Sequence, residues 1–167
     1  MLTNNFRKIL KNMFNNTTLL VKDNMVGLDG KIITYTREDS IPLSFLKKSR
    51  QAILTSDDTE PEGVFIAYGN GTTIATSNDY NLEGEITDLT LLANSVSITD
   101  NGYIITSSIK NTSNEDIIVK ELGIFETSSS FNQYGNRLTF MLARKVLETP
   151  ITIKPNETKT FTVTINF

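Results

Sequence analysis

Alternating apolar and polar residues mark the C-terminal end of the chain as a β-strand. Successive side chains of a strand point to opposite faces, so apolar residues at every second position give one buried face. The apolar face comprises Phe161, Val163, Ile165 and Phe167, and the polar face comprises Thr160, Thr162, Thr164 and Asn166. Residues 155–157, Pro-Asn-Glu, predict the turn that leads into this strand.

The rest of the chain after residue 63 consists of β-rich runs between polar turns. The runs span residues 63–69, 85–99, 103–111, 117–127, 137–147 and 149–153. Asp100, Asn101 and Gly102 predict a hairpin turn between the second and third runs, and the length of the second run predicts a twisted or bulged strand. Because no helical period separates the runs, the sequence predicts a mainly-β fold, an antiparallel β-sandwich of immunoglobulin-like or jelly-roll-like type.

A helical period occurs at the N-terminus. Apolar residues there follow the spacing i, i+3, i+4, i+7 and i+8, and they are Phe6, Ile9, Leu10, Met13 and Phe14. This spacing predicts a short amphipathic helix with Asn4 or Asn5 as its N-cap. A helix this short is marginal alone, so its apolar face must dock on its own domain or on a neighbouring subunit.

Residues 1–58 and residues 59–167 are expected to be organised differently. After the helix the pattern is loose, with a turn and a strand expected at residues 32–36 and no clean period beyond them. We therefore divide the chain into an N-terminal helix and extended arm, residues 1–58, and a β-sandwich domain, residues 59–167. The arm is long for a sandwich of this size, so we expect the five apolar helix residues to make assembly contacts.

The composition disfavours an enzyme. The chain has no histidine, cysteine or tryptophan, which excludes the usual nucleophile–base pairs, imidazole and thiolate metal ligands, and disulfides. Carboxylates remain, and Glu83, Glu85 and Asp88 are the candidates for a glycosidase-like acid–base pair. Since Glu83 and Glu85 would share one strand face and no tryptophan lines a cleft, we expect no catalytic residue and no cofactor.

Two polar loops resemble ligand sites in composition, but neither matches a motif. Residues 69–73 (Gly-Asn-Gly-Thr-Thr) lack the lysine of a phosphate-binding loop and the third glycine of a dinucleotide fingerprint, so we interpret them as a turn whose glycines adopt positive φ. The acidic residues of the other loop are Asp57, Asp58, Glu60 and Glu62. Their spacing matches no EF-hand, so a solvated loop is the simpler interpretation and a cation site the alternative.

Charge is distributed unevenly along the chain. Residues 1–50 hold nine Lys/Arg and four Asp/Glu, whereas residues 51–100 hold nine Asp/Glu and no Lys/Arg. Residues 101–167 hold seven Lys/Arg and six Asp/Glu. Together the three segments give the net charge of −3. Such segments either neutralise each other within one fold or join a basic part of one subunit to an acidic part of the next. A basic cluster at residues 47–50 is too small to predict nucleic-acid binding, and no apolar run is long enough to predict a membrane partner.

The stretch from Ala67 to Ile86 resembles a pattern of small virion structural proteins of tailed bacteriophages and prophages. In that pattern a strand ends in Gly-x-Gly-Thr-Thr, and a polar spacer leads to Asp-Tyr-x-Leu-Glu. The corresponding residues are Gly69, Gly71, Thr72, Thr73, Asp79, Tyr80, Leu82 and Glu83. Residues 109–126 and 141–167 resemble the Glu-x-Gly-Ile-Phe strand and the closing strands of the same proteins, so the resemblance covers about residues 64–167.

The resemblance implies a non-enzymatic structural subunit of a tailed-bacteriophage virion. Such a subunit is made in the host cytoplasm and acts by assembly with other virion proteins and, as a homo-oligomer, with its own copies. Head decoration, neck, tail, baseplate and fibre attachment are all compatible with it. The alternative is a carbohydrate- or host-surface-binding sandwich, whose contact residues would be Phe131 and Tyr134 in the loop at residues 127–136 and whose partner would be a host surface glycan.

Overall fold

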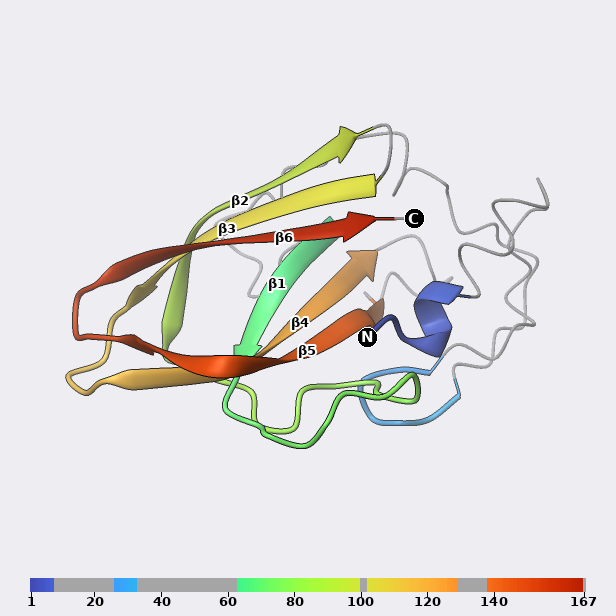
Figure 1. Ribbon diagram of the computed structural model, residues 1–167, viewed down its shortest axis with the longest axis horizontal. Coiled ribbons are helices and arrows are strands. Elements are labelled where there is room, and N and C mark those ends of the chain that lie inside the picture. Colours follow the sequence, from blue (N-terminus) through green and yellow to red (C-terminus); the bar gives the residue numbers. More distant parts are fainter. Residues whose placement is uncertain (8–25, 33–62, 100–101, 129–137, 167) are drawn as a thin grey trace.

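A computed structural model of the chain describes residues 1–7, 26–32, 63–99, 102–128 and 138–166. These residues form two antiparallel sheets of three strands each, with little helix (Figure 1). The strands are β1 (Gly63–Gly69), β2 (Leu89–Thr99), β3 (Gly102–Asn111), β4 (Ile117–Ser128), β5 (Leu138–Ile153) and β6 (Thr158–Asn166). The predicted mainly-β antiparallel fold is confirmed, and the two sheets lie face to face in a sandwich-like arrangement.

The strand order brings β5 and β6 to the same side of the sandwich. One sheet has the order β1-β4-β5 and the other the order β2-β3-β6. The predicted turn after β5 is confirmed, with Asn156 at φ 63° and Glu157 N donating to Lys154 O at 2.9 Å. From this turn β5 and β6 diverge toward the two chain termini (Figure 1). The sandwich therefore opens between β5 and β6 near the termini.

The main core lies between the two sheets. β1, β4 and β5 contribute Ile66, Tyr68, Ile124, Phe140 and Leu142, and β3 and β6 contribute Ile105, Ile109, Phe161 and Ile165. The rings of Tyr68 and Phe161 pack across the two layers with their centroids 4.9 Å apart. Most of these residues occupy alternate positions of their strands, so the two-residue period of the sequence creates the packed interior directly.

The connection between β1 and β2, residues 70–88, packs on the outer face of the β1-β4-β5 sheet. Leu82 from this connection is buried with Phe125 of β4 and Met141 of β5, in a cluster separate from the main core. Figure 1 shows the connection as a long green segment that starts at the end of β1 and runs below β5. The connection is therefore a packed layer of its own, and its side chains lie next to β4 and β5.

The hairpin and the bulge predicted for the second and third runs are confirmed. β2 pairs with β3 in antiparallel register up to the pair Thr99–Gly102, and the register shifts between Leu91 and Ala93. Burial alternates along β6 as predicted, while Phe167 lies outside the described residues.

The sequence predicts two separate runs where the structure has the single strand β5. Pro150 marks the break in the pattern, because a proline has no N–H to offer to a sheet. The pairing of β5 with β4 shifts around it, between the pairs Val119–Ile151 and Glu121–Val146. The prediction of two strands is therefore wrong, since an irregularity absorbs the proline within one strand.

Residues 1–3 cover part of the outer edge of β5. Thr3 N donates to Leu142 O at 2.9 Å, and Arg144 N donates to Met1 O at 3.0 Å. The N-terminal ammonium of Met1 donates in turn to Arg144 O at 2.6 Å. The first residues of the chain therefore act as a short extra strand on the β1-β4-β5 sheet.

A helical turn begins directly after this contact, at residues 4–7. Phe6 N donates to Thr3 Oγ1 at 3.4 Å, so Thr3 is the N-cap. The prediction of Asn4 or Asn5 as the cap is therefore wrong, because the cap is the residue whose backbone also pairs with β5.

Phe6 packs within the chain itself. Its side chain is completely buried in the main core, and Asn5 next to it exchanges two hydrogen bonds with the backbone of Val26, at 2.8 and 3.0 Å. Phe6 therefore has no surface left for a neighbouring subunit. The other predicted assembly contacts, Ile9, Leu10, Met13 and Phe14, lie outside the described residues, as does most of the strand expected at residues 32–36.

We expect Thr3→Val to lower the free energy of unfolding by about 1–2 kcal/mol. Thr3 is buried, and its hydroxyl lies 2.8 Å from Met141 O and 3.0 Å from Leu142 O, to one of which it donates. Valine keeps the shape but loses both this donor and the helix cap. Urea unfolding followed by circular dichroism measures the change. Thr152→Val, at an exposed position of β5, is the control, and equal effects of the two variants would contradict the anchoring role of Thr3.

Candidate functional site

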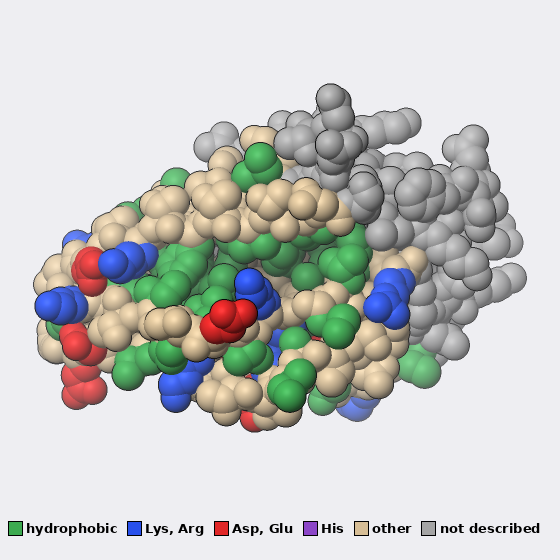
Figure 2. Space-filling model, in the orientation of Figure 1, with side chains coloured by type: hydrophobic (Ala, Val, Ile, Leu, Met, Phe, Trp, Pro, Cys, Tyr) green, Lys and Arg blue, Asp and Glu red, His purple; other side chains and the backbone are tan. Residues whose placement is uncertain are grey.

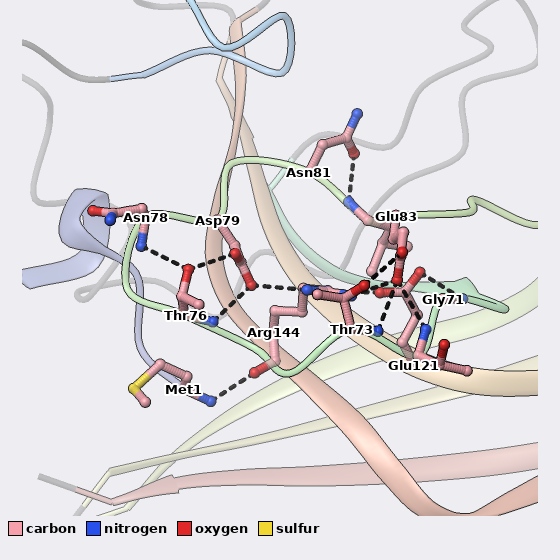
Figure 3. A network of polar contacts seen from close by, with 12 residues as sticks. Met1, Gly71, Thr73, Thr76, Asn78, Asp79, Asn81, Glu83, Glu121 and Arg144 are labelled. Carbon is pink, nitrogen blue, oxygen red and sulfur yellow. Dashed lines mark hydrogen bonds and ion pairs between the residues drawn. The ribbon is translucent and has the colours of Figure 1, made fainter.

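Residues that are distant in the sequence converge around Arg144 of β5 (Figure 3). Three carboxylates surround its guanidinium, namely Asp79 and Glu83 from the β1–β2 connection and Glu121 from β4. Arg144 Nε donates to Glu121 Oε2 at 2.6 Å, and Nη1 donates to Asp79 Oδ2 at 3.0 Å. Arg144 Nη2 lies 3.5 Å from Glu83 Oε2. We call these four residues the Arg144 network.

Glu121 is the most deeply buried member of the Arg144 network. Its side chain has no exposed surface, and its second oxygen, Oε1, accepts hydrogen bonds from Gly71 N and Gly84 N, each at 3.0 Å. A buried charge without partners is strongly unfavourable. Both oxygens of Glu121 are satisfied only when the β1–β2 connection lies against the sheet, so this carboxylate holds the connection in place.

The two other carboxylates bind the connection to itself. Asp79 accepts hydrogen bonds from Thr76 N at 3.0 Å and Thr76 Oγ1 at 2.7 Å. Glu83 Oε2 accepts from Thr72 N and Thr73 N, both at 2.9 Å, and Glu83 Oε1 accepts from Thr73 Oγ1 at 2.6 Å. Every carboxylate oxygen of the Arg144 network thus accepts at least one hydrogen bond.

These contacts favour the charged forms of the side chains. The hydrogen bonds from Thr73 and Thr72 lower the pKa of Glu83. Burial acts to raise the pKa of Asp79, but hydrogen bonds from Thr76 and Arg144 outweigh it and lower that pKa. Burial likewise acts to lower the pKa of Arg144, and its carboxylate partners raise it. These shifts keep Asp79, Glu83 and Arg144 ionised at neutral pH, which favours an anchor over a proton-transfer site.

Gly69 and Gly71 are needed for close packing rather than for an unusual backbone. Among the described glycines only Gly30 has a positive φ, of 74°, so the predicted positive-φ turn at residues 69–73 is wrong. A Cβ atom at Gly71 would lie 2.5 Å from Glu121 Oε1, and one at Gly69 would also collide with this carboxylate. The missing side chains let the backbone reach the buried carboxylate.

Sequence reasoning singled out Asp79 and Glu83 through the resemblance but missed Glu121 and Arg144 as site residues. The sequence does mark these two residues, because each is a charged residue inside an apolar strand run. A charged residue that is buried in a strand has to be paired in the fold.

The structure separates the three carboxylates considered for catalysis. Glu83 belongs to the Arg144 network, Glu85 forms an isolated bridge with Gly69, and Asp88 precedes β2. Glu85 and Asp88 are exposed and form no ion pair with any other described residue. Within the described ranges, no group of three or more acidic residues could hold a metal ion.

An apolar groove runs between β5 and β6, where the sandwich opens. Its volume is about 310 Å³, and its lining consists of Met1, Leu2, Leu122, Ile124, Ala143, Arg144, Lys145, Val163, Thr164, Ile165 and Asn166. Figure 2 shows this hydrophobic strip between two polar bands on the face turned to the viewer. The ammonium of Met1 and the exposed Lys145 make its rim basic. We call this feature the β5–β6 groove.

Several predicted sites lie outside the described residues and stay predictions. They are the glycan-contact candidates Phe131 and Tyr134, the acidic residues Asp57, Asp58, Glu60 and Glu62, and the basic cluster at residues 47–50. In the part of the chain that the structure describes, no helix is both long and apolar enough to cross a membrane.

Searches against protein-family models, characterised proteins and solved structures give no match for this chain.

Proposed function

We propose that the chain is a non-enzymatic structural subunit of a tailed-bacteriophage virion that acts by protein–protein assembly. The observation that carries this proposal is the Arg144 network. Residues from all three stretches that resemble virion proteins, around Gly71, Glu121 and Arg144, meet in one place. There they fix a 19-residue connection, residues 70–88, to the sheet.

The geometry of the Arg144 network supports a structural role for these residues. Arg144 forms ion pairs with the three carboxylates, and the carboxylates also accept hydrogen bonds from backbone N–H groups. The charges of the network are therefore paired within the fold. An assembly subunit has to present a rigid surface to its neighbours, since ordering a flexible surface on binding costs free energy. A connection that is clamped to the sheet by buried ionic contacts meets this requirement.

The β5–β6 groove supports the assembly part of the proposal. It combines an apolar floor with a basic rim beside the edge strand β6, and exposed apolar surface of this kind is typical of interaction sites. An assembly contact would bury this surface and thereby contribute free energy of association.

Antibodies raised against the purified chain test the virion assignment. In negative-stain electron microscopy of phage particles from the organism that carries this sequence, we expect the antibodies to label tailed particles at one fixed position. Pre-immune antibodies serve as the control. Labelling of cell material with no labelled particles would contradict the proposal.

A further inference from the structure

An asparagine followed directly by a glycine opens the β1–β2 connection, at Asn70 and Gly71. In such a pair the backbone nitrogen of the glycine can attack the side-chain amide carbon of the asparagine, because glycine has no side chain to block the approach and its backbone bends easily. Asn70 is exposed, whereas Gly71 is buried against Glu121 of the Arg144 network (Figure 3). How this network holds the pair therefore decides whether it reacts.

The reaction of an Asn-Gly pair needs only water. The nitrogen of Gly71 forms a bond to Cγ of Asn70, and its proton passes through solvent to the side-chain nitrogen, which departs as ammonia when its bond to Cγ breaks. Water then opens the resulting succinimide ring at either carbonyl group. An aspartate or an isoaspartate remains in place of Asn70, and each product carries one negative charge that the asparagine does not have.

Glu121 opposes the first step of this reaction. Gly71 N donates to Glu121 Oε1 at 3.0 Å, and a negative carboxylate beside the nitrogen disfavours the loss of its proton. Glu121 is itself engaged by Arg144 Nε at 2.6 Å and by Gly84 N at 3.0 Å. The nitrogen that has to attack is thus held, still protonated, by a carboxylate that the network fixes in place.

The residues around the reacting atoms are fixed as well. Asn70 N donates to Gly84 O at 2.8 Å, and Asn70 Oδ1 lies so close to Gly84 that a Cβ atom there would collide with it. On the other side, Thr72 N and Thr73 N both donate to Glu83 Oε2 at 2.9 Å. The succinimide ring can therefore form only when this segment leaves the network.

We propose that the Arg144 network protects a self-modifying Asn70–Gly71 pair, and that opening of the network permits an irreversible reaction that releases the β1–β2 connection from the sheet. Isoaspartate adds one carbon atom to the main chain directly before Gly71, which moves the donor that Glu121 requires. Either product also places a new negative charge beside the carboxylates of the network. A transient opening thereby becomes permanent. This chemistry depends on the network alone and holds whether or not the chain belongs to a virion.

Peptide mapping by mass spectrometry over a time course at neutral pH measures the reaction. In the folded parent we expect Asn70 to react about 10- to 100-fold more slowly than in the same chain unfolded in urea, since a hydrogen bond to a charged group shifts an equilibrium by about this factor. Arg144→Met should remove most of this protection, whereas Lys145→Met should keep it. Asn101–Gly102 is the other Asn-Gly pair of the sequence and is the internal reference, because global unfolding would accelerate both pairs and local release only Asn70.

The rates at Asn70 decide the proposal. Equal rates in the folded and the urea-unfolded parent would show that the fold gives no protection. A folded rate above the unfolded rate would show that Glu121 acts as a base that promotes the reaction, which is the opposite of the proposed role. A folded Arg144→Met protein that reacts as slowly as the parent would overturn the role of the network. If this variant unfolds, both pairs reach their rates in urea, and the comparison of folded with unfolded parent decides alone.

Release of the connection has a separate readout. The modified parent carries an additional negative charge and can be separated from the unmodified protein by ion exchange. A glutamate-specific protease should cut the modified form after Glu83 or Glu85 while the unmodified form stays intact there. Equal cleavage of the two forms would overturn the release of the connection.

Discussion

Replacing Arg144 with methionine is expected to lower the free energy of unfolding by about 3–5 kcal/mol, because the substitution leaves three carboxylates without their cation. The largest part of this cost comes from Glu121, since its side chain is fully buried and its Oε2 loses the hydrogen bond from Arg144 Nε, at 2.6 Å. Methionine fills most of the space of the arginine stem, so the loss reports the charge rather than a large cavity. Urea unfolding followed by circular dichroism measures the change at neutral pH.

Lys145→Met is the matched control for this variant. Lys145 is the next residue of β5 and is exposed, so the same change of residue type should alter the free energy of unfolding by no more than about 0.5 kcal/mol. A similar effect of the two substitutions would contradict the anchoring role of the Arg144 network. Limited proteolysis adds a local readout, because Arg144→Met should expose the connection at residues 70–88 to cleavage before the strands are cut.

Glu126→Gln is expected to remove a large pH dependence of stability. Glu126 of β4 is buried between its strand partners Val64 and Phe140, and its Oε2 has no hydrogen-bond partner among the described residues. Burial raises the pKa of Glu126 from 4.5 to about 8, so the folded protein keeps this side chain protonated at neutral pH.

The direction of the effect follows from the two pKa values. Below pH 4.5 the carboxyl is protonated in both the folded and the unfolded chain, and Glu126 contributes no penalty. Between pH 4.5 and about pH 8 the unfolded chain releases the proton while the folded chain retains it, so the free energy of unfolding falls as the pH rises. The loss is complete above about pH 8 and amounts to roughly 4–5 kcal/mol.

Urea unfolding at a series of pH values measures this effect. The difference in free energy of unfolding between Glu126→Gln and the parent should grow in favour of the variant from about pH 4 to about pH 9. The lowered pKa values of Asp79 and Glu83 and the raised pKa of Tyr68, about 12, belong to the parent and the variant alike, so their contributions cancel in this difference. Glu148→Gln on the exposed side of β5 controls for the loss of a carboxylate. A constant difference between Glu126→Gln and the parent would show that Glu126 does not hold a proton in the folded state.

Local patterns predicted most of the β-strands. The two-residue alternation of β6, the hairpin pairing of β2 with β3 and the irregular run of β2 each depend on neighbours in the sequence, and each is confirmed. The prediction failed at β5, where Pro150 interrupts the pattern but not the strand. A proline shows that one ladder hydrogen bond is missing, but the sequence does not show whether the partner strand can accommodate a bulge there.

The Arg144 network could not be assembled from local patterns. Glu121 and Arg144 pair across neighbouring strands, and Asp79 reaches Arg144 from a connection 65 residues earlier. Only the order of strands in the sheet brings these residues together. The sequence does offer one hint, since Glu121, Glu126 and Arg144 are charged residues inside apolar runs. Two of them prove to be paired, and burial keeps the third protonated.

The two glycines of the same site illustrate a similar limit. Gly69 and Gly71 were expected to supply positive φ, which is a local property of the backbone. The structure needs them because Glu121, about 50 residues later in the chain, approaches their Cα atoms closely. A contact of that kind depends on the tertiary fold, and the sequence marks only that a small residue is present.

The mass of the purified protein in solution tests the central claim, that this chain is an assembly subunit, most directly. Light scattering after size exclusion gives this mass without a standard of known shape. We predict a discrete oligomer whose mass is a whole multiple of the 18.7 kDa chain, with a ring size that points to a place in the particle. A monomer at all concentrations measured would contradict the claim of self-assembly.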